Sequence, residues 1–303
     1  MMEDVLRVSG QDACPSGGTV KLDPVKCFWN GGMIFGAVCL APFHFSWSAL
    51  ALFLILTYIT LLIGHSVGMH RMMIHRTFRC LKPIERLLIY IGVLVGIGGP
   101  SAIIKIHDTR DWAQRKAACH DFFSHKRSYL RDVTWQLFYK FDFRKPPLLT
   151  IEDSLAHDPW IRFFDATWRL HQLALALILY AIGGFPWLVW GVCVRVSAST
   201  IGHWSITYIC HNPGPGHWDV KGAGVQASNL NINFAGLLTH GECWHNNHHA
   251  FPESARIGLE RGQTDPAWWI IKTMQKRGWA IDVKLPRGIN LRDDLTARGI
   301  SKT

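Results

Sequence analysis

The chain has 303 residues, enough for one large domain or two small ones. Its 32 Lys and Arg residues outnumber 22 Asp and Glu residues, which gives a net charge of +10, yet charged residues make up only 18% of the sequence. This low charge density excludes a disordered chain, which needs low hydrophobicity and dense charge. The 16 histidines and 14 tryptophans stand out, because histidine is the commonest metal ligand and tryptophan is enriched at membrane interfaces.

The first segment, residues 1–26, carries acidic side chains and no apolar run. It therefore does not have the form of a signal peptide, and we expect it to be a cytoplasmic N-terminal segment. None of the eight cysteines forms a C-x-x-C pair, which argues against a zinc ribbon or a redox motif. We expect them to be reduced thiols.

The stretch from Phe28 to Met69 contains no charged residue. It is long enough for two membrane crossings of about 20 residues each. We expect these crossings at 27–43 and 47–67, which together form a transmembrane hairpin over 27–67.

The stretch from Leu170 to Tyr208 is also apolar and is interrupted by a Gly-Gly-Phe-Pro motif. It predicts a second transmembrane hairpin over 166–208. The expected crossings are 167–183 and 186–208. The single charge in this stretch, Arg195, is costly inside a bilayer and indicates a functional role. We expect it to contact an anionic substrate headgroup.

The basic residues lie mainly in two long segments, 68–165 and 209–303, and the short turns inside the hairpins have none. By the positive-inside rule, we expect both segments and both termini to be cytoplasmic. Nucleic-acid binding, another reason for a basic chain, does not fit two apolar hairpins. A fifth apolar run, 87–106, is either a crossing or a buried helix, because periodicity does not separate the two.

The first histidine cluster is the pair His70 and His75, at the start of the first cytoplasmic segment. On an α-helix, two residues five apart lie about 140° apart around the axis. We therefore expect the pair to flank two ions or to straddle the end of a helix, and not to bind one ion from one helical face.

The second cluster is the strongest, with His245, His248 and His249 within five residues. This spacing places three imidazoles on one helical face, and neutral imidazole suits iron or zinc. The third cluster is His107 and Asp111, which are four residues apart and resemble the histidine and carboxylate pairs of non-haem iron sites. The alternative for this third cluster is a surface helix with an ion-paired aspartate.

These motifs resemble those of the membrane fatty acyl desaturases of the stearoyl-CoA desaturase type. The first box of that family, H-x-x-x-x-H followed by R-T-[FY], matches the sequence from His70 to Phe78. The third box, G-E-x-[WF]-H-N-x-H-H-x-F-P, matches the sequence from Gly241 to Pro252. The resemblance covers about residues 60–285. It implies an all-α integral membrane protein with four transmembrane helices in two hairpins and a helical cytoplasmic cap that carries a histidine-rich metal site.

The family binds two irons through nine histidines, and this chain keeps seven of those positions. Its second box, H-x-x-H-H in the family, is degenerate here, because Asp111 stands where the last histidine should be. The resemblance implies these iron ligands: His70, His75, His107, Asp111, His211, His245, His248 and His249. Four further residues are expected to replace a missing ligand or to lie behind the ligands: His120, His203, Thr207 and Asn246. His125 is a similar candidate, and no function is expected for His44, His65, His157, His171, His217 or His240.

The resemblance further implies O2-dependent desaturation of a lipid acyl chain in an acyl-CoA, a phospholipid or an acyl carrier. The open alternatives are a hydroxylase or acetylenase on the same scaffold and a non-catalytic lipid-binding relic. The first 26 residues are too short for a fused cytochrome b5 domain, so a separate ferredoxin, rubredoxin or cytochrome b5 is expected to supply electrons. The expected location is the cell inner membrane or the endoplasmic reticulum.

The resemblance also bears on the fifth apolar run, because it implies that His75 and His107 reach one site on one side of the membrane. The run 87–106 then either folds into the cap or re-enters the membrane, and we expect a cap helix. Asp265 and Pro266 have the form of a helix start, and Gly278 that of a stop. We expect this last helix to pack against the scaffold or the membrane surface.

Overall fold

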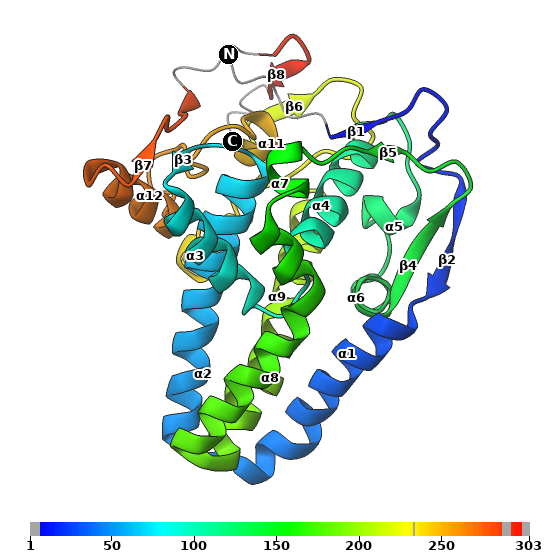
Figure 1. Cartoon of the computed structure of the whole chain (residues 1–303). Coiled ribbons are helices and arrows are strands. Elements are labelled where there is room, and N and C mark those ends of the chain that lie inside the picture. The colour runs from blue at the N-terminus through cyan, green and yellow to red at the C-terminus, as the bar shows by residue number, and fades with distance from the viewer. Residues whose placement is uncertain (1–6, 233, 287–291, 299–303) are drawn as a thin grey trace.

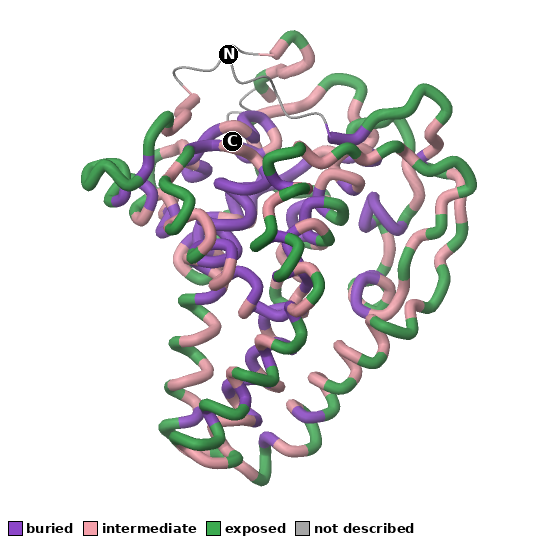
Figure 2. The backbone as a smooth tube through the Cα atoms, viewed as in Figure 1, coloured by how far each residue is buried: buried purple, intermediate pink, exposed green. Residues whose placement is uncertain are grey.

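The computed structural model describes residues 7–232, 234–286 and 292–298. The protein is mostly helical, and long helices extend from one side of a cap that contains the shorter elements (Figure 1). The long helices are α1 (Pro24–Phe35), α2 (Trp47–Ile59), α8 (Pro159–Leu188) and α9 (Arg195–Cys210). Figure 2 shows mostly exposed and intermediate backbone along them and buried backbone in the cap, as expected for helices whose outer faces contact lipid.

Several irregular helical turns extend the long helices. They are the π-helical segments η1 (Gly36–Leu40), η3 (Thr60–Ile74) and η4 (Val189–Val194), and the 3-10 turn η2 (Ala41–His44). With them, three stretches in the described part of the chain are long and apolar enough to cross a membrane. These are Pro24–His44, Trp47–Ile74 and Pro159–Cys210.

The third stretch has 52 residues and is not one straight helix. Gly184 has φ 67° and ψ −163°, which breaks the helix inside the Gly-Gly-Phe-Pro motif predicted to separate two crossings. In Figure 1, α8 runs from the cap to this end of the molecule, and the chain then returns through η4 to α9 in the cap. The protein therefore has three membrane-length stretches, and four separate crossings remain a prediction.

Side-chain caps explain where the long helices start. Asp23 accepts hydrogen bonds from the backbone N–H groups of Val25 and Lys26, at 3.0 and 3.2 Å. Ser46 caps α2 and Asp158 caps α8 in the same way. These side chains pair backbone donors that a helix N-terminus leaves free.

The apolar run 87–106 forms parts of two helices, α3 (Lys82–Val93) and α4 (Pro100–Gln114), instead of the single cap helix that was expected. Its glycines and Pro100 explain the break, because they end α3 and start α4. Neither helix reaches the roughly 20 residues that a membrane crossing needs.

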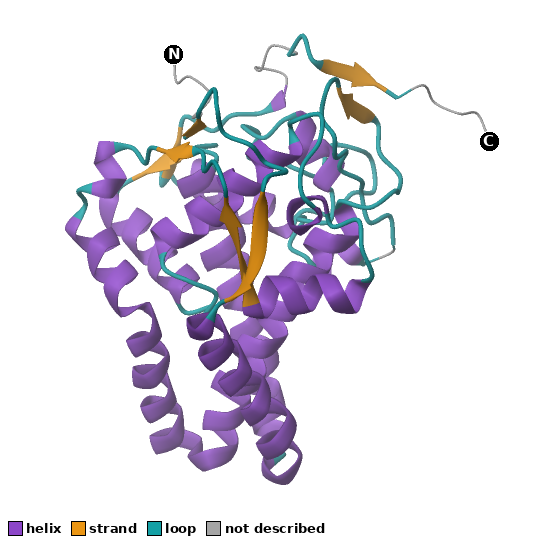
Figure 3. Cartoon of the chain, turned by 90° about the vertical axis from the view of Figure 1, so that its right-hand side faces the viewer, coloured by secondary structure: helices purple, strands orange, loops and turns teal. Residues whose placement is uncertain are grey.

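The protein is mostly helical, as expected, and the described residues also form four two-stranded antiparallel sheets in the cap (Figure 3). They pair β1 (Val8–Ser9) with β5 (Leu148–Leu149), β2 (Gly18–Leu22) with β4 (Tyr139–Phe143), β3 (Arg79–Cys80) with β7 (Ala280–Ile281), and β6 (Trp218–Val220) with β8 (Leu295–Ala297). Each pair joins segments far apart in the sequence, which sequence periodicity does not reveal.

The cap also contains six shorter helices. They are α5 (Asp121–Ser124), α6 (Tyr129–Phe138), α7 (Asp153–Ala156), α10 (Ala235–Leu238), α11 (His245–Ala250) and α12 (Pro266–Lys276). The predicted start of α12 is confirmed, because Asp265 accepts a hydrogen bond from the Trp268 N–H at 3.0 Å. Its Ile271 and Met274 are buried, so this face packs against the scaffold.

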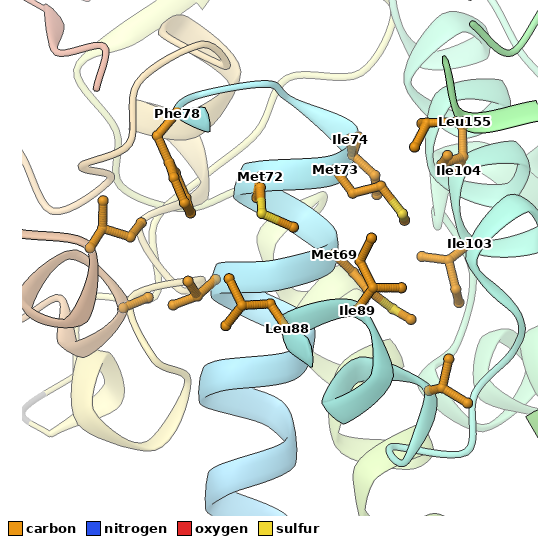
Figure 4. Close-up of a cluster of buried hydrophobic side chains, with 14 of the residues drawn as sticks. Met69, Met72, Met73, Ile74, Phe78, Leu88, Ile89, Ile103, Ile104 and Leu155 are labelled. Carbon is orange, nitrogen blue, oxygen red and sulfur yellow. The ribbon is translucent and has the colours of Figure 1, made fainter. Parts of the chain in front are cut away.

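The main apolar core surrounds η3, with side chains from α3 and α4 packed against it (Figure 4). Glycines allow the closest approach. A Cβ on Gly68 would lie 2.8 Å from the Leu88 carbonyl oxygen, and one on Gly64 would overlap the backbone of Gly92. This packing fixes η3, which carries the first histidine box.

Arg7 ties the N-terminal segment to this core, and its side chain is only 2% exposed. Its guanidinium donates to the carbonyl oxygens of Met73 and Ile74 at 3.2 and 3.1 Å. It also forms ion pairs with Asp108 at 2.9 Å and with Glu152 at 2.8 Å. One side chain thus joins the end of η3, helix α4 and the segment before α7.

Candidate metal centre

Seven histidines gather in two groups inside the cap. Each histidine of a group offers one ring nitrogen as a potential ligand, and within a group these nitrogens all lie within 4.8 Å of one another. The first group contains His70, His75, His107 and His248, and the second contains His211, His245 and His249. All seven histidines that the sequence predicts as ligands are therefore brought together.

The first group contains His70 and His75 because η3 is π-helical. The His75 N–H donates to the His70 carbonyl oxygen at 3.1 Å, which is the i→i+5 bond of a π-helix. The two rings lie 4.8 Å apart. His75 is the C-cap that follows Ile74, so the pair straddles the end of a helix, which is one of the two expected arrangements.

Helix α11 contributes histidines to both groups. Nε2 of His245 and Nε2 of His249 lie 3.1 Å apart in the second group. His248 points to the first group instead, where its ring lies 4.5 Å from that of His75 and 4.6 Å from that of His70. A helix of six residues therefore supplies ligands to two groups, which places the groups next to each other. The expectation that all three imidazoles share one helical face was wrong, because His248 points to a different group from His245 and His249.

Oxygen atoms of the protein orient several of these rings. Nδ1 of His70 lies 2.8 Å from Glu242, and Nδ1 of His107 lies 2.9 Å from Asp108. Nδ1 of His211 lies 2.7 Å from the Thr207 carbonyl oxygen. Such contacts fix the tautomer and leave Nε2 as the ligand atom, as in many metal sites. Sequence reasoning gave Asp108 and Glu242 no role, although each adjoins a histidine box.

The donor atoms fit a metal ion. Nε2 of His75 and Nε2 of His107 face each other at 3.2 Å. Nε2 of His211 and Nδ1 of His248 are buried with no hydrogen-bond partner among the described residues. Buried polar atoms are almost always paired, and a cation bound to neutral imidazoles would pair these.

Burial keeps the three imidazoles of α11 neutral. It lowers the pKa values of His245 and His248 well below the usual range, and neighbouring histidines lower them further. It lowers the pKa of His249 to about 4. Because a metal binds the unprotonated ring, a neutral ring is ready to bind at physiological pH.

Asp111 lies beside both groups without belonging to either. Its Oδ2 is 3.7 Å from Nε2 of His107, its Oδ1 is buried without a hydrogen bond, and its side chain is 14% exposed. Burial alone would raise the pKa of Asp111, but His107, His249 and Arg110 lower it strongly. The carboxylate is therefore charged and faces the histidines.

The structure places the other predicted residues in different roles. His120 caps α5, since its Nδ1 accepts from the Phe122 N–H at 3.1 Å, and it lies outside both groups. The Asn246 side chain accepts from the backbone N–H groups of His217 and Trp218 and donates to Trp218 and Ala227 carbonyl oxygens, so it holds a loop.

Two of the remaining candidates lie close to the second group. Thr207 orients His211 through its carbonyl oxygen. The His125 ring lies 5.4 Å from that of His211, and its Nδ1 is 3.0 Å from Asp132. His203 is different, because it belongs to neither group and lines a cavity instead.

Arg195 does not have the environment expected for a headgroup contact. It is fully buried, and its Nε and Nη2 donate to the Gly191 carbonyl oxygen and Gln172 Oε1, each at 2.6 Å. Its Nη1 donates to the Leu94 carbonyl oxygen. All three guanidinium nitrogens therefore have protein partners, so we assign this residue to the packing of the long helices against the cap.

A cavity of about 320 Å³ reaches both histidine groups. Most of its wall is apolar, with Leu61, Ile103 and Trp204 among the lining residues. His70 and His107 of the first group and His245 of the second also line it. The cavity has the chemistry to hold an apolar chain beside the metal ligands.

Comparisons with known proteins agree with this chemistry. The fatty acid desaturase family model matches residues 45–283. The acyl-CoA 5-desaturase of Anemone leveillei is 32% identical over 304 residues, covering 93% of this chain and 90% of the relative. The palmitoyl-monogalactosyldiacylglycerol delta-7 desaturase of Arabidopsis thaliana is 34% identical, covering 84% and 70%. The sn-1 stearoyl-lipid 9-desaturase of Anabaena variabilis is 32% identical, covering 84% and 91%.

Proposed function

We propose that this chain, which belongs to the fatty acid desaturase family, introduces a double bond into a lipid acyl chain at a non-haem di-iron centre, with O2 as oxidant. Membership in the family makes it an oxidoreductase that acts on fatty acyl chains. The observation that carries the di-iron proposal is the division of seven histidines into two adjacent groups that share α11.

A saturated methylene has no acidic proton, so side-chain acid–base chemistry does not reach it. Iron bound to the histidines would supply the oxidising power that removes two hydrogens. The first histidine group would hold one iron. The second group would hold the other, with Asp111 as a further carboxylate ligand. The imidazole and carboxylate donors present here are those that non-haem iron sites use.

The protein's own contribution is orientation and exclusion of water. Glu242 and Asp108 hold His70 and His107 in place through their Nδ1 atoms. The apolar wall of the 320 Å³ cavity would align an acyl chain against both groups. The depth to which the acyl chain enters this cavity would decide which of its carbons are oxidised.

We further propose a multi-pass protein of the cell inner membrane or endoplasmic reticulum with four crossings, the last two separated at Gly184, and with both termini and the cap cytoplasmic. The substrate would be an acyl-CoA, a phospholipid or an acyl carrier, since the relatives include enzymes named for CoA and for lipid substrates. We expect no nucleic-acid partner.

Electrons would come from a separate ferredoxin, rubredoxin or cytochrome b5. A second cavity, of about 290 Å³, reaches His75 and His107 and is lined by Arg115 and Lys116. Both basic residues are exposed. Asp108, Asp111 and Glu253 line the same cavity, so it is the two exposed cations, and not the cavity as a whole, that would attract an acidic electron carrier.

This function is tested by expressing the protein in cells and analysing the acyl chains of the cellular lipids. In cells that make saturated lipids, we expect acyl chains that have lost two hydrogens, measured by lipid mass spectrometry. The His107→Gln variant, which keeps a polar side chain without the imidazole, should give none. Chains that gain one oxygen instead would identify a hydroxylase. An iron-free protein that copurifies with lipid and changes no chain would identify a lipid-binding relic.

The proposed role of Asp111 as an iron ligand is tested separately. We expect Asp111→Ala to lower the iron content of the purified protein from two towards one per chain, because the second group then offers only three imidazoles. Asp121→Ala removes an acidic residue at the start of α5 and should leave the iron content unchanged. Unaltered iron content and an unaltered Mössbauer spectrum in Asp111→Ala would show that this carboxylate is no ligand.

A further inference from the structure

Three histidines that belong to neither histidine group line the 320 Å³ cavity: His65, His203 and His240. His65 on η3 and His203 on α9 lie next to each other. Their rings meet edge to face at 4.8 Å with an interplanar angle of 84°. The His65 ring also lies parallel to that of His70 at 6.5 Å, so the pair is adjacent to the first histidine group.

The other hydroxyl groups in this wall already have partners inside the protein. Thr207 Oγ1 donates to the His203 carbonyl oxygen at 3.1 Å, Ser205 Oγ to that of Ile201 at 2.7 Å, and Thr239 Oγ1 to that of Ala235 at 2.7 Å. Ser66 Oγ donates to Glu242.

His65 and His203 differ from these residues. Among the described residues, no hydrogen bond involves the ring nitrogens of His65 or His203, and these nitrogens are not fully enclosed by protein, so they can be reached from the cavity. Nδ1 of His240 in the same wall is buried without a hydrogen-bond partner. Two imidazoles with free nitrogens thus face a cavity whose wall is otherwise mostly apolar.

A plain methylene chain in this cavity would leave these nitrogens unpaired, which is unfavourable for buried polar atoms. A neutral imidazole has one donor and one acceptor nitrogen. Two adjacent imidazoles can therefore donate to an oxygen atom and accept the proton of a hydroxyl group. A site built in this way favours a ligand that carries the oxygen over one that lacks it.

We propose that His65 and His203 bind an oxygen of the acyl substrate directly beside the metal groups and so select which chain enters and which carbons are oxidised. This inference rests on the proposed desaturase function. The oxygen belongs either to a hydroxyl group within the chain or to the carbonyl group that links the chain to its carrier. In the second case, oxidation falls a few carbons from the carboxyl end.

The test measures binding to the full-length protein loaded with zinc in place of iron, so that it does not depend on turnover. Dissociation constants are determined by competition against a radiolabelled stearoyl lipid. The competitors are a stearoyl lipid, hydroxystearoyl lipids with the hydroxyl at successive carbons, and an ether-linked stearyl lipid that lacks the carbonyl. All have the same headgroup.

If the oxygen is within the chain, one hydroxystearoyl isomer should bind the wild-type protein about 10- to 100-fold more tightly than the stearoyl lipid. If it is the carbonyl, the ether lipid should bind more weakly than the stearoyl lipid by a similar factor. In both cases His65→Leu and His203→Leu should abolish the difference and keep the metal content. His171→Leu, the same change on α8 outside this cavity, should preserve it.

The inference is wrong if the two leucine variants discriminate among the three probe classes as the wild-type protein does, or if the wild-type protein does not discriminate. A failure of the proposed desaturase function is distinct from this outcome, because the iron-loaded protein would then form no double bond in any probe while the binding differences could persist.

Discussion

Replacing His248 with alanine is expected to remove the iron of the first group while the second group keeps its iron, and replacing His249 is expected to do the opposite. The two residues are neighbours in sequence, but α11 points them to different groups. Each variant should retain about half of the wild-type iron and lose desaturation by at least ~100-fold, since even residues behind a metal ligand cost 10- to 100-fold in affinity or activity. Iron analysis and Mössbauer spectroscopy of the purified variants measure this directly.

His217→Ala is the matched control for these variants. His217 follows the last long helix, is about half exposed and lies outside both groups. It should retain full iron content and activity. Loss of the same Mössbauer component in His248→Ala and His249→Ala would contradict the assignment, because it would mean that both residues bind one iron.

Replacing Arg71 with methionine is expected to destabilise the cap by about 3–5 kcal/mol, the typical effect of removing one partner from a buried ion pair. The Arg71 side chain is 1% exposed and forms an ion pair with Asp265, itself 2% exposed, at 2.9 Å. It also donates to the Ala255 carbonyl oxygen at 2.8 Å. The variant would leave the Asp265 charge buried without its cation. Thermal unfolding of the purified protein in detergent should show a large fall in the transition midpoint.

Arg71→Lys should be milder, because lysine keeps the charge but lacks the forked guanidinium. Lys21→Met is the surface control, since the ion pair between Lys21 and Asp142 is more than half exposed on both sides, and little change is expected. A midpoint for Arg71→Met that equals the wild-type value would show that this ion pair does not hold η3 against the segment before α12.

Sequence patterns were sufficient to predict the features that depend on short, specific spacings between residues. The histidine boxes identified six of the seven residues in the two groups, the family resemblance at the end of the last apolar run added His211, and the Gly-Gly-Phe-Pro motif marked the kink at Gly184. The Asp265 cap similarly marked the start of α12. These features depend on local chemistry, which a sequence displays directly.

Features that depend on tertiary contacts were not predictable in the same way. The spacing of His70 and His75 was interpreted with α-helical periodicity, and only the π-helical hydrogen bonding of η3 brings the two rings together. Arg195 looked like an unpaired charge in an apolar run, but it donates to Gln172 and to the Leu94 carbonyl oxygen, both in other segments of the chain, and to the Gly191 carbonyl oxygen one turn earlier. His65 appeared to need no function until the fold placed it against His203.

The contacts of Arg7 have a consequence for biosynthesis. Its partner Glu152 is 145 residues further along the chain, and Asp108 is 101 residues further. At ~5–20 residues per second, a ribosome needs roughly 7–30 seconds between making Arg7 and making Glu152. During that interval the first apolar hairpin has already emerged, while Arg7 and the end of η3 still lack their carboxylate partners. The cap can therefore close only after the first half of the chain has left the ribosome, and both histidine groups are completed later still, when α11 arrives.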